Sequence, residues 1–250
     1  MDMYSTAPNN WRSLQQKVYR IFKDIGFGAE TQKTIQTARG KVEVDVFAER
    51  SKPIRMVILA ECKHWNRSIP KSVVHAFSKV VQDYGANLGY IISKVGFNAG
   101  AYDAAKFTNI RLLTWEEFKN TFELEWLKSL SPRVSEDFRL LMDCTEPLVA
   151  TSVFKIVNAL PKRKQAEFMR LRNEFCELGS LTTTVAVFAH AEDFFGMKFP
   201  SRLCIGKRQF NITSSWELVD WVYAQGTKAQ KSLGRILRSQ KGLGAHPERN

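Results

Sequence analysis

The segment Met56-Val-Ile-Leu-Ala-Glu-Cys-Lys63 joins an uninterrupted apolar run to a charged triplet. Such a run is typical of a strand at the centre of a sheet, buried on both faces. Because residues two apart in a strand share a face, Glu61 and Lys63 are expected to project together, with Cys62 on the opposite face. Glu-x-Lys alone is a common solvated pair. At the end of a central strand, however, two charges are costly without a purpose, so the triplet predicts a functional site.

The segments around this strand alternate between helical and extended patterns. Apolar residues recur at helical spacing over residues 11–26, and Gly26 ends that helix. The other elements follow as strands at 31–37, 41–47 and 56–63, a helix at 70–84, a strand at 88–93, a short helix at 98–107, a strand at 110–113 and a helix from Thr114. A hairpin-built sheet followed by β-α-β crossovers predicts an α/β fold, a mixed sheet flanked by helices.

The strand at 41–47 brings a second carboxylate to the triplet. Its period of two predicts one face with Val42, Val44 and Val46 and another with Glu43, Asp45 and Phe47. Asp45 would then converge with Glu61 and Lys63. Two carboxylates suit Mg²⁺, which keeps several waters and takes one or two protein carboxylates. Such a metal activates a bound water toward a phosphodiester, and a neighbouring lysine orients that water and stabilises the developing charge.

The character of the chain changes around Leu130-Ser131-Pro132. We therefore expect two domains, 1–130 and 131–250, the second mainly helical. Residues 133–178 have a helical pattern with a break at Pro161, whereas residues 181–190 fit either a strand or a buried helix. Near the end we expect one helix that begins at Ser214 or Ser215 and a separate final helix over Lys228–Gln240.

Charge and cysteine content restrict the class of protein. The net charge of +12 and the pI of about 9.6 point to a polyanionic partner, nucleic acid first and an anionic membrane surface second. No apolar run is long enough to cross a bilayer, and the N-terminus has no secretory signal, so a cytoplasmic protein with no membrane association is expected. The 4 cysteines are scattered without a CxxC pair, which argues against a zinc site or a disulfide framework.

Four stretches resemble the Mrr-like branch of the restriction-endonuclease-like nucleases, whose signature is (P)D…(D/E)xK. They are the first helix ending at Gly26-Phe27, Arg39-Gly-Lys-Val-Glu-Val-Asp45-Val-Phe, Ala60-Glu61-Cys62-Lys63-His64-Trp65, and Gly85 to Ala105 with its Gly96-Phe-Asn-Ala-Gly motif. The resemblance covers about residues 11–118 and implies a restriction-endonuclease-like fold. It also implies that Asp45, Glu61 and the Cys62 backbone carbonyl bind the metal and that Lys63 is the catalytic lysine.

Two departures from the family pattern concern the metal. Val44 stands where a proline sometimes precedes the first aspartate, which the family tolerates. Gln15 or Gln16 stands where the first helix often has an acidic residue, so the number of metal ions stays open.

Residues that could contact DNA lie outside the triplet. His64, Trp65, Asn66 and Arg67 follow it directly and could approach a phosphate or stack on a base, or simply form a loop before the next helix. Gln82 could support the lysine or the DNA backbone, or be a surface glutamine. In the final helix one face carries the basic residues Lys228, Lys231, Arg235 and Arg238. Such a face is either solvated or lies along a phosphate backbone, and the nuclease motif favours the second interpretation.

The sequence therefore predicts a cytoplasmic endodeoxyribonuclease that uses Mg²⁺, or Mn²⁺ in its place, in restriction or defence against foreign DNA. The alternatives are a repair or junction-resolving nuclease on the same fold and a DNA-binding regulatory module whose nuclease site has decayed. A homodimer or a defence-system partner protein is compatible with each of these.

Overall fold

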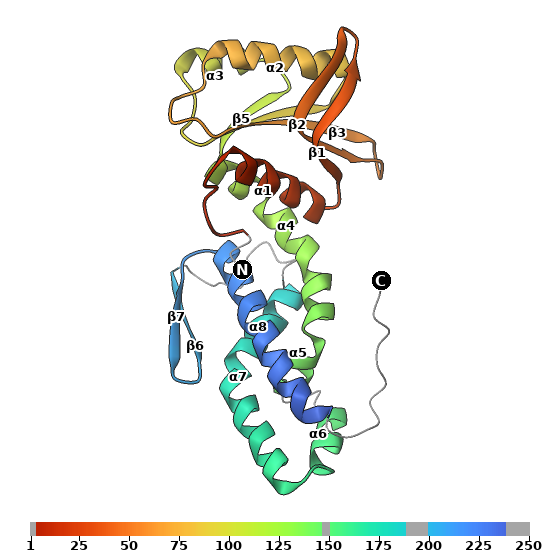
Figure 1. The fold of residues 1–250 in the computed structure, drawn as a ribbon, viewed down its shortest axis with the longest axis vertical. Helices are drawn as coiled ribbons and strands as arrows, with labels where there is room; N and C mark the ends of the chain where they lie inside the picture. The colour runs from red at the N-terminus through yellow and green to blue at the C-terminus, as the bar shows by residue number, and fades with distance from the viewer. Residues whose placement is uncertain (1–3, 147–150, 189–199, 239–250) are drawn as a thin grey trace. The chain divides into compact units, whose positions relative to one another are not determined.

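The computed structural model describes residues 4–146, 151–188 and 200–238 (Figure 1). The chain divides into two compact units, the N-terminal unit, Thr6–Ser129, and the C-terminal unit, Leu130 onward with Tyr4 and Ser5. The division lies inside one helix, α4 (Trp115–Asp137), which continues through Pro132. The structure thus assigns Tyr4 and Ser5 to the unit formed by the second half of the chain.

A five-stranded mixed sheet forms the centre of the N-terminal unit. Its elements are α1 (Trp11–Asp24), β1 (Gly28–Thr37), β2 (Gly40–Arg50), β3 (Met56–Lys63), α2 (Lys71–Tyr84), β4 (Leu88–Ser93), α3 (Ala99–Ala105) and β5 (Ile110–Thr114). The strands lie in chain order, with β1, β2 and β3 antiparallel and β3, β4 and β5 parallel. Helices α2 and α3 cover one face and α1 the other (Figure 1). The predicted α/β fold is confirmed.

Local signals set the helix ends as the sequence predicts. Helix α1 begins after Asn10, whose side chain accepts a 2.8 Å hydrogen bond from the Ser13 N–H. Helix α2 ends at Gly85, which has a left-handed φ of 75°. At the start of α4, Thr114 and Glu117 exchange hydrogen bonds as a capping box.

The alternation of faces along β2 changes at Asp45. Val44 and Phe47 pack in one core beneath α2 although they are three residues apart. Opposite Asp45, Gln32 of β1 has a left-handed φ of 52°, and the register of the two strands omits a Gln32–Asp45 pair. The predicted common face for Val42, Val44 and Val46 is therefore wrong at Val46, because the faces reverse where the pairing is interrupted at Gln32 and Asp45.

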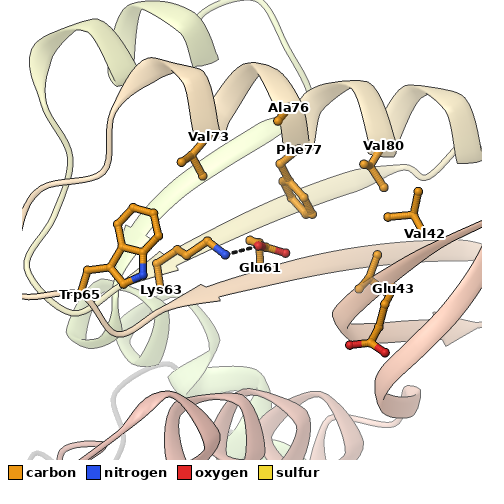
Figure 2. Close-up of a pocket in the computed structure, with 10 residues that line it drawn as sticks. Val42, Glu43, Glu61, Lys63, Trp65, Val73, Ala76, Phe77 and Val80 are labelled. Atoms are coloured by element: carbon orange, nitrogen blue, oxygen red, sulfur yellow. Dashed lines mark hydrogen bonds and ion pairs between the residues drawn. The ribbon is translucent and has the colours of Figure 1, made fainter.

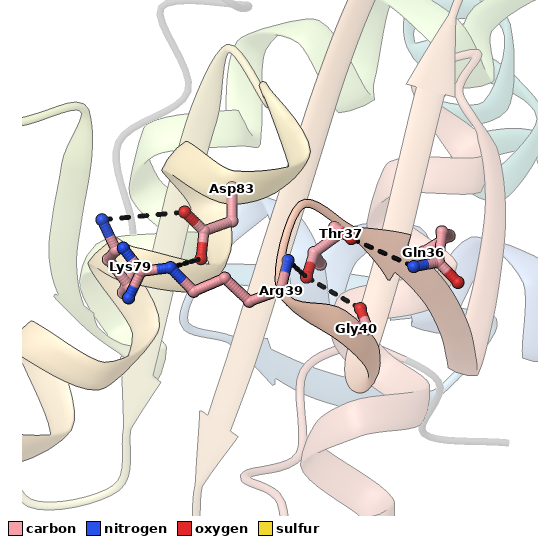
Figure 3. Close-up of polar contacts among 6 residues, drawn as sticks. All are labelled: Gln36, Thr37, Arg39, Gly40, Lys79 and Asp83. Carbon is pink, nitrogen blue, oxygen red and sulfur yellow. Dashed lines mark hydrogen bonds and ion pairs between the residues drawn. The ribbon is translucent and has the colours of Figure 1, made fainter.

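The β1–β2 hairpin is fastened to the end of α2 (Figure 3). The Ala38 N–H donates to the Asp83 carbonyl over 3.1 Å, and Arg39 Nε lies 3.2 Å from Asp83 Oδ2. Lys79 Nζ lies 3.7 Å from the other oxygen of that carboxylate. Within the turn, the Thr37 hydroxyl donates to the Gly40 carbonyl. These contacts hold the far end of the hairpin against α2.

The C-terminal unit is largely helical, as predicted. Besides the end of α4 it contains α5 (Arg139–Thr145), α6 (Thr151–Asn158), α7 (Lys162–Phe188), α8 (Ser215–Leu237) and an antiparallel strand pair, β6 (Ser201–Ile205) and β7 (Arg208–Ile212). Residues 181–188 are helical, which resolves the open choice over that stretch, and residues 189 and 190 lie outside the described residues. The strand pair was not predicted. No helix in the described ranges is both long and apolar enough to span a bilayer.

One helix replaces the two that were expected near the end of the chain. Helix α8 begins after Ser214, whose side chain caps it, and runs without interruption to Leu237. Gly226 lies within this helix, and a Cβ at this position would come within 2.8 Å of the Phe138 ring. Close packing, not chain termination, therefore accounts for this glycine. The last two residues of the predicted Lys228–Gln240 helix lie outside the described residues.

Asp220 of α8 binds the N-terminal segment. Its Oδ2 accepts hydrogen bonds from the Tyr4 N–H, the Ser5 N–H and the Ser5 hydroxyl at 3.0, 2.9 and 2.8 Å. Asp220 and Tyr4 are both buried, and the Tyr4 ring lies 6.1 Å from that of Trp216. Residues more than two hundred positions apart in the sequence are therefore packed together in the C-terminal unit.

Candidate active site

The strands β2 and β3 part at the predicted site. Their register ends at the Val46–Ala60 pair. At the preceding residue of β2, the Asp45 carboxylate accepts a 2.7 Å hydrogen bond through Oδ2 from the Cys62 N–H of β3. This bond fixes one oxygen of Asp45 at the edge of β3 and leaves Oδ1 for another partner.

Glu61 and Lys63 lie side by side on β3 and form an ion pair. Both side chains are about one-fifth exposed, at 22% and 21%, whereas Cys62 between them is fully buried on the opposite face. Burial raises the pKa of Glu61, the nearby charge of Asp45 raises it further, and Lys63 opposes both effects. The charges of Asp45 and Lys63 thus both act on the pKa of Glu61, as is expected if the three residues form one site.

Gln15 of α1 supports Asp45 from the other side of the sheet. Its side chain is almost fully buried, with 1% exposed, and its Nε2 donates a 2.9 Å hydrogen bond to the Asp45 main-chain carbonyl. The neighbouring Gln16 is exposed. Of the two glutamines at the position of the family's acidic residue, Gln15 therefore lies at the site.

The donor set of this site fits a hard cation such as Mg²⁺. Asp45 and Glu61 supply carboxylate oxygens, and Mg²⁺ completes its coordination with water and so needs few protein ligands. Among the described residues, no group of three or more His, Cys, Asp or Glu side chains is arranged to hold a metal ion.

A cavity of about 340 Å³ opens beside Glu61 and Lys63 (Figure 2). Helix α2 forms one wall, and β2, β3 and Trp65 form the rest. The lining residues are Val42, Glu43, Val44, Glu61, Lys63, Trp65, Val73, Ala76, Phe77 and Val80. Its walls are mostly apolar, which the sequence did not indicate because α2 and β2 meet only in the fold.

The residues after the triplet differ in their surroundings. A ring nitrogen of His64, Nε2, lies 3.0 Å from the Pro8 carbonyl oxygen. Arg67 is exposed and its guanidinium lies 5.2 Å from the centre of the Trp65 ring. Gln82 is exposed on the side of α2 opposite the cavity, so the structure does not bring it to Glu61 and Lys63.

The basic residues of α8 lie as the helical spacing predicts. Lys228, Lys231, Arg235 and Arg238 are exposed, and Leu233, Ile236 and Leu237 are buried. Three of the four, Lys231, Arg235 and Arg238, line a surface cavity of about 400 Å³ with Gln230 and Gly234.

Of the residues that shape the site, Gln32 was not identified from the sequence, and Gln15 was only one of two candidates for the position of the family's acidic residue. Gln32 adopts the left-handed backbone conformation opposite Asp45, and no turn residue marks that position. Gln15 falls on the buried face of α1, so a polar residue at an apolar helical position was the available signal.

Comparison with known families gives a match over residues 7–122 to the Mrr catalytic domain, described as a restriction endonuclease. No curated protein sequence matches the chain. Among solved structures, the crystal structure of the protein of unknown function AF1548 covers 75% of this chain and 100% of its own, with 19% identity and a TM-score of 0.40.

Proposed function

We propose that the chain, whose residues 7–122 match the restriction endonuclease family of the Mrr catalytic domain, is a metal-dependent endodeoxyribonuclease that acts in restriction of foreign DNA. The observation that carries the proposal is the hydrogen bond from the Cys62 N–H to Asp45, beside the Glu61–Lys63 pair, where β2 and β3 part. It brings together the three residues of the family signature.

Each residue has a role that its position supports. Asp45 Oδ1, the Glu61 carboxylate and the Cys62 carbonyl would hold Mg²⁺, or Mn²⁺ in its place. When bound, the metal supplies Lewis-acid activation of water and of the phosphodiester oxygen. Lys63 holds Glu61 in the absence of substrate and would orient the attacking water and stabilise negative charge on the phosphate. Gln15 keeps the Asp45 backbone in position.

The exposed basic face of α8 would supply affinity for the DNA backbone. Each phosphate that a lysine or arginine neutralises contributes about 0.9 to the slope of log affinity against log salt concentration. The double variant Lys231→Ala/Arg235→Ala is expected to weaken DNA binding across sequences and to reduce that slope by about 2. An unchanged slope would assign this face to solvent or to a protein partner.

Cleavage assays test the enzyme proposal. Wild type, Lys63→Ala and the exposed control Lys106→Ala are incubated with plasmid, linear and branched DNA, with Mg²⁺, Mn²⁺ or EDTA. We expect metal-dependent cleavage by wild type and the control, and a loss of at least about a hundredfold in Lys63→Ala. Binding of DNA with no cleavage of any substrate would instead support the regulatory module, and cleavage restricted to branched DNA the junction-resolving nuclease.

A further inference from the structure

The cavity beside Glu61 and Lys63 has walls that phosphodiester hydrolysis does not require. The hydrolytic residues need only meet a phosphate and its metal, which charged and polar groups serve. Six of the lining residues are instead apolar: Val42, Val44, Val73, Ala76, Phe77 and Val80. Phe77 and Val44 are buried, whereas Val42, Val73 and Val80 are partly exposed and Ala76 is exposed. An apolar surface accessible from the catalytic residues is suited to an apolar part of the substrate.

The β1–β2 hairpin and its contacts with α2 maintain the cavity. Beyond the change of faces at Gln32 and Asp45, Val44 packs in the core beneath α2, and Val42 lines the cavity together with residues of α2. The Arg39–Asp83 ion pair holds the end of the hairpin against α2. The volume of about 340 Å³ lies at the lower end of the range for small-ligand pockets, roughly 300–1,000 Å³. The space is therefore bounded and of a size for a ring system rather than for a protein segment.

Trp65 lines one end of this cavity, and two cations lie near its ring. Lys63 Nζ is 5.7 Å and the Arg67 guanidinium 5.2 Å from the centre of its ring. Figure 2 shows the indole beside Lys63, below the helix that carries Val73. An aromatic ring with cations near it suits a nucleotide, because the base stacks on the ring and the phosphates meet the charges.

Resting on the proposed nuclease function, we propose that this cavity receives one nucleobase of the DNA strand being cut, turned out of the base stack and stacked on Trp65. The adjoining phosphodiester then lies at Glu61 and Lys63. Unstacking a base costs least where it is unpaired or mismatched. The substrate class is accordingly DNA that is single-stranded or locally unpaired at the cut, in preference to an intact duplex.

Binding without metal tests the cavity separately from catalysis. A labelled single strand and a strand of the same length made of abasic residues are titrated in EDTA by fluorescence anisotropy. Wild type is expected to bind the strand with bases roughly tenfold or more tightly than the abasic strand. Ala76→Phe, which fills the cavity from an exposed position, and Trp65→Ala should each remove most of this preference. His75→Phe introduces the same ring at an exposed neighbouring position that does not line the cavity and should retain the preference.

The abasic strand gives the decisive comparison. Loss of affinity for the base-containing strand alone in Ala76→Phe and Trp65→Ala supports the proposal. Wild-type affinity in both variants, or equal loss on both strands, overturns it. If Ala76→Phe does not fold by circular dichroism, Trp65→Ala decides alone, since it removes the ring without filling the space.

A cleavage experiment with Mg²⁺ separates this inference from the proposed function. Single abasic residues are placed at successive positions around the mapped cut. One such position is expected to restore cutting by Ala76→Phe to within about threefold of wild type, because the added ring then replaces the missing base. Equal cutting of intact DNA by wild type and Ala76→Phe contradicts the cavity assignment while the nuclease function stands. Base-dependent binding with no cutting by any form contradicts the nuclease function while the assignment stands.

Discussion

The side-chain amide of Gln15 donates a 2.9 Å hydrogen bond to the main-chain carbonyl of Asp45. It joins the buried face of α1 to the residue whose carboxylate binds the Cys62 N–H. Asp45 is thereby held through both its backbone and its side chain, at the one place where the β1–β2 register is interrupted.

Replacing Gln15 by alanine should destabilise the protein. The Asp45 carbonyl loses its partner in a buried environment, which costs about 1–3 kcal/mol. Gln16→Ala, at the exposed neighbouring position, should change the free energy of unfolding by no more than about 0.5 kcal/mol. Urea denaturation of the two variants provides the comparison, and equal stability would show that the Gln15–Asp45 bond contributes nothing.

Two glycines of α8 should respond differently to replacement by alanine. A Cβ at Gly226 would come within 2.8 Å of the Phe138 ring, whereas at Gly234 the nearest atom is a Leu140 methyl at 3.4 Å. We expect Gly226→Ala to lower stability by about 1–3 kcal/mol because the helices must move apart. Gly234→Ala should be neutral or stabilising, by up to about 1 kcal/mol, because alanine favours the helix. Thermal unfolding of both variants measures these changes. A Gly226→Ala variant more stable than wild type would contradict the close approach of Gly226 to the Phe138 ring.

Ionisation of Glu61 should oppose folding in the absence of metal. Burial and then Asp45 raise the pKa of this carboxyl, with Lys63 opposing them. The folded chain therefore holds the proton more tightly than the unfolded chain, and stability falls as the pH rises through the raised pKa. Below the ordinary glutamate pKa of about 4.3 this cost is absent.

Glu61→Gln is accordingly expected to be more stable than wild type at neutral pH in EDTA, with the difference disappearing on acidification. Urea denaturation of both proteins across the pH range measures the difference in their free energies of unfolding. Glu30→Gln, which removes an exposed carboxylate, serves as the control and should show no such gain. A Glu61→Gln variant less stable than wild type at neutral pH would show that the Lys63 ion pair outweighs burial.

The cysteines should differ in reactivity in the native protein. Burial, with a contribution from Asp143, raises the pKa of the Cys144 thiol to about 12, and burial also raises that of Cys62. Cys176 is exposed. Because the thiolate is the reactive form, iodoacetamide at neutral pH should modify Cys176 and leave Cys62 and Cys144 intact. Peptide mass spectrometry measures the modification at each cysteine, and the urea-unfolded chain, in which all cysteines should react, is the control. Modification of Cys62 or Cys144 in the native protein as fast as that of Cys176 would contradict the prediction.

Much of the N-terminal unit could be predicted because its signals are local. The spacing of Leu14, Val18 and Ile21 marks the buried side of α1, and Gly85 ends α2. The apolar run before Glu61 placed the charged triplet at the end of a central strand. Period-two alternation failed within β2 because the left-handed Gln32 lies on another strand and carries no turn signal.

The remaining features depend on contacts between distant segments. Gly226 packs closely against the Phe138 ring, from which it is far removed in the sequence. The binding of Tyr4 and Ser5 to Asp220 joins opposite ends of the chain, which no spacing rule reaches. The short strands β6 and β7 alternate apolar with polar residues around Gly206, a hairpin signal too brief to outweigh the helical pattern on both sides.

Metal-dependent cleavage by an Asp45→Asn variant tests the account most directly. This variant is nearly isosteric, but it removes the charge that would hold the metal beside Glu61. Glu49→Gln, on the same strand and paired with Arg55 away from the triplet, is the matched control. With Mg²⁺ and single-stranded or locally unpaired DNA, we predict cleavage by wild type and Glu49→Gln, none in EDTA, and a loss of at least about a hundredfold in Asp45→Asn. Cleavage by Asp45→Asn at the wild-type rate, or cleavage that persists in EDTA, would contradict a metal-dependent site built on Asp45, Glu61 and Lys63.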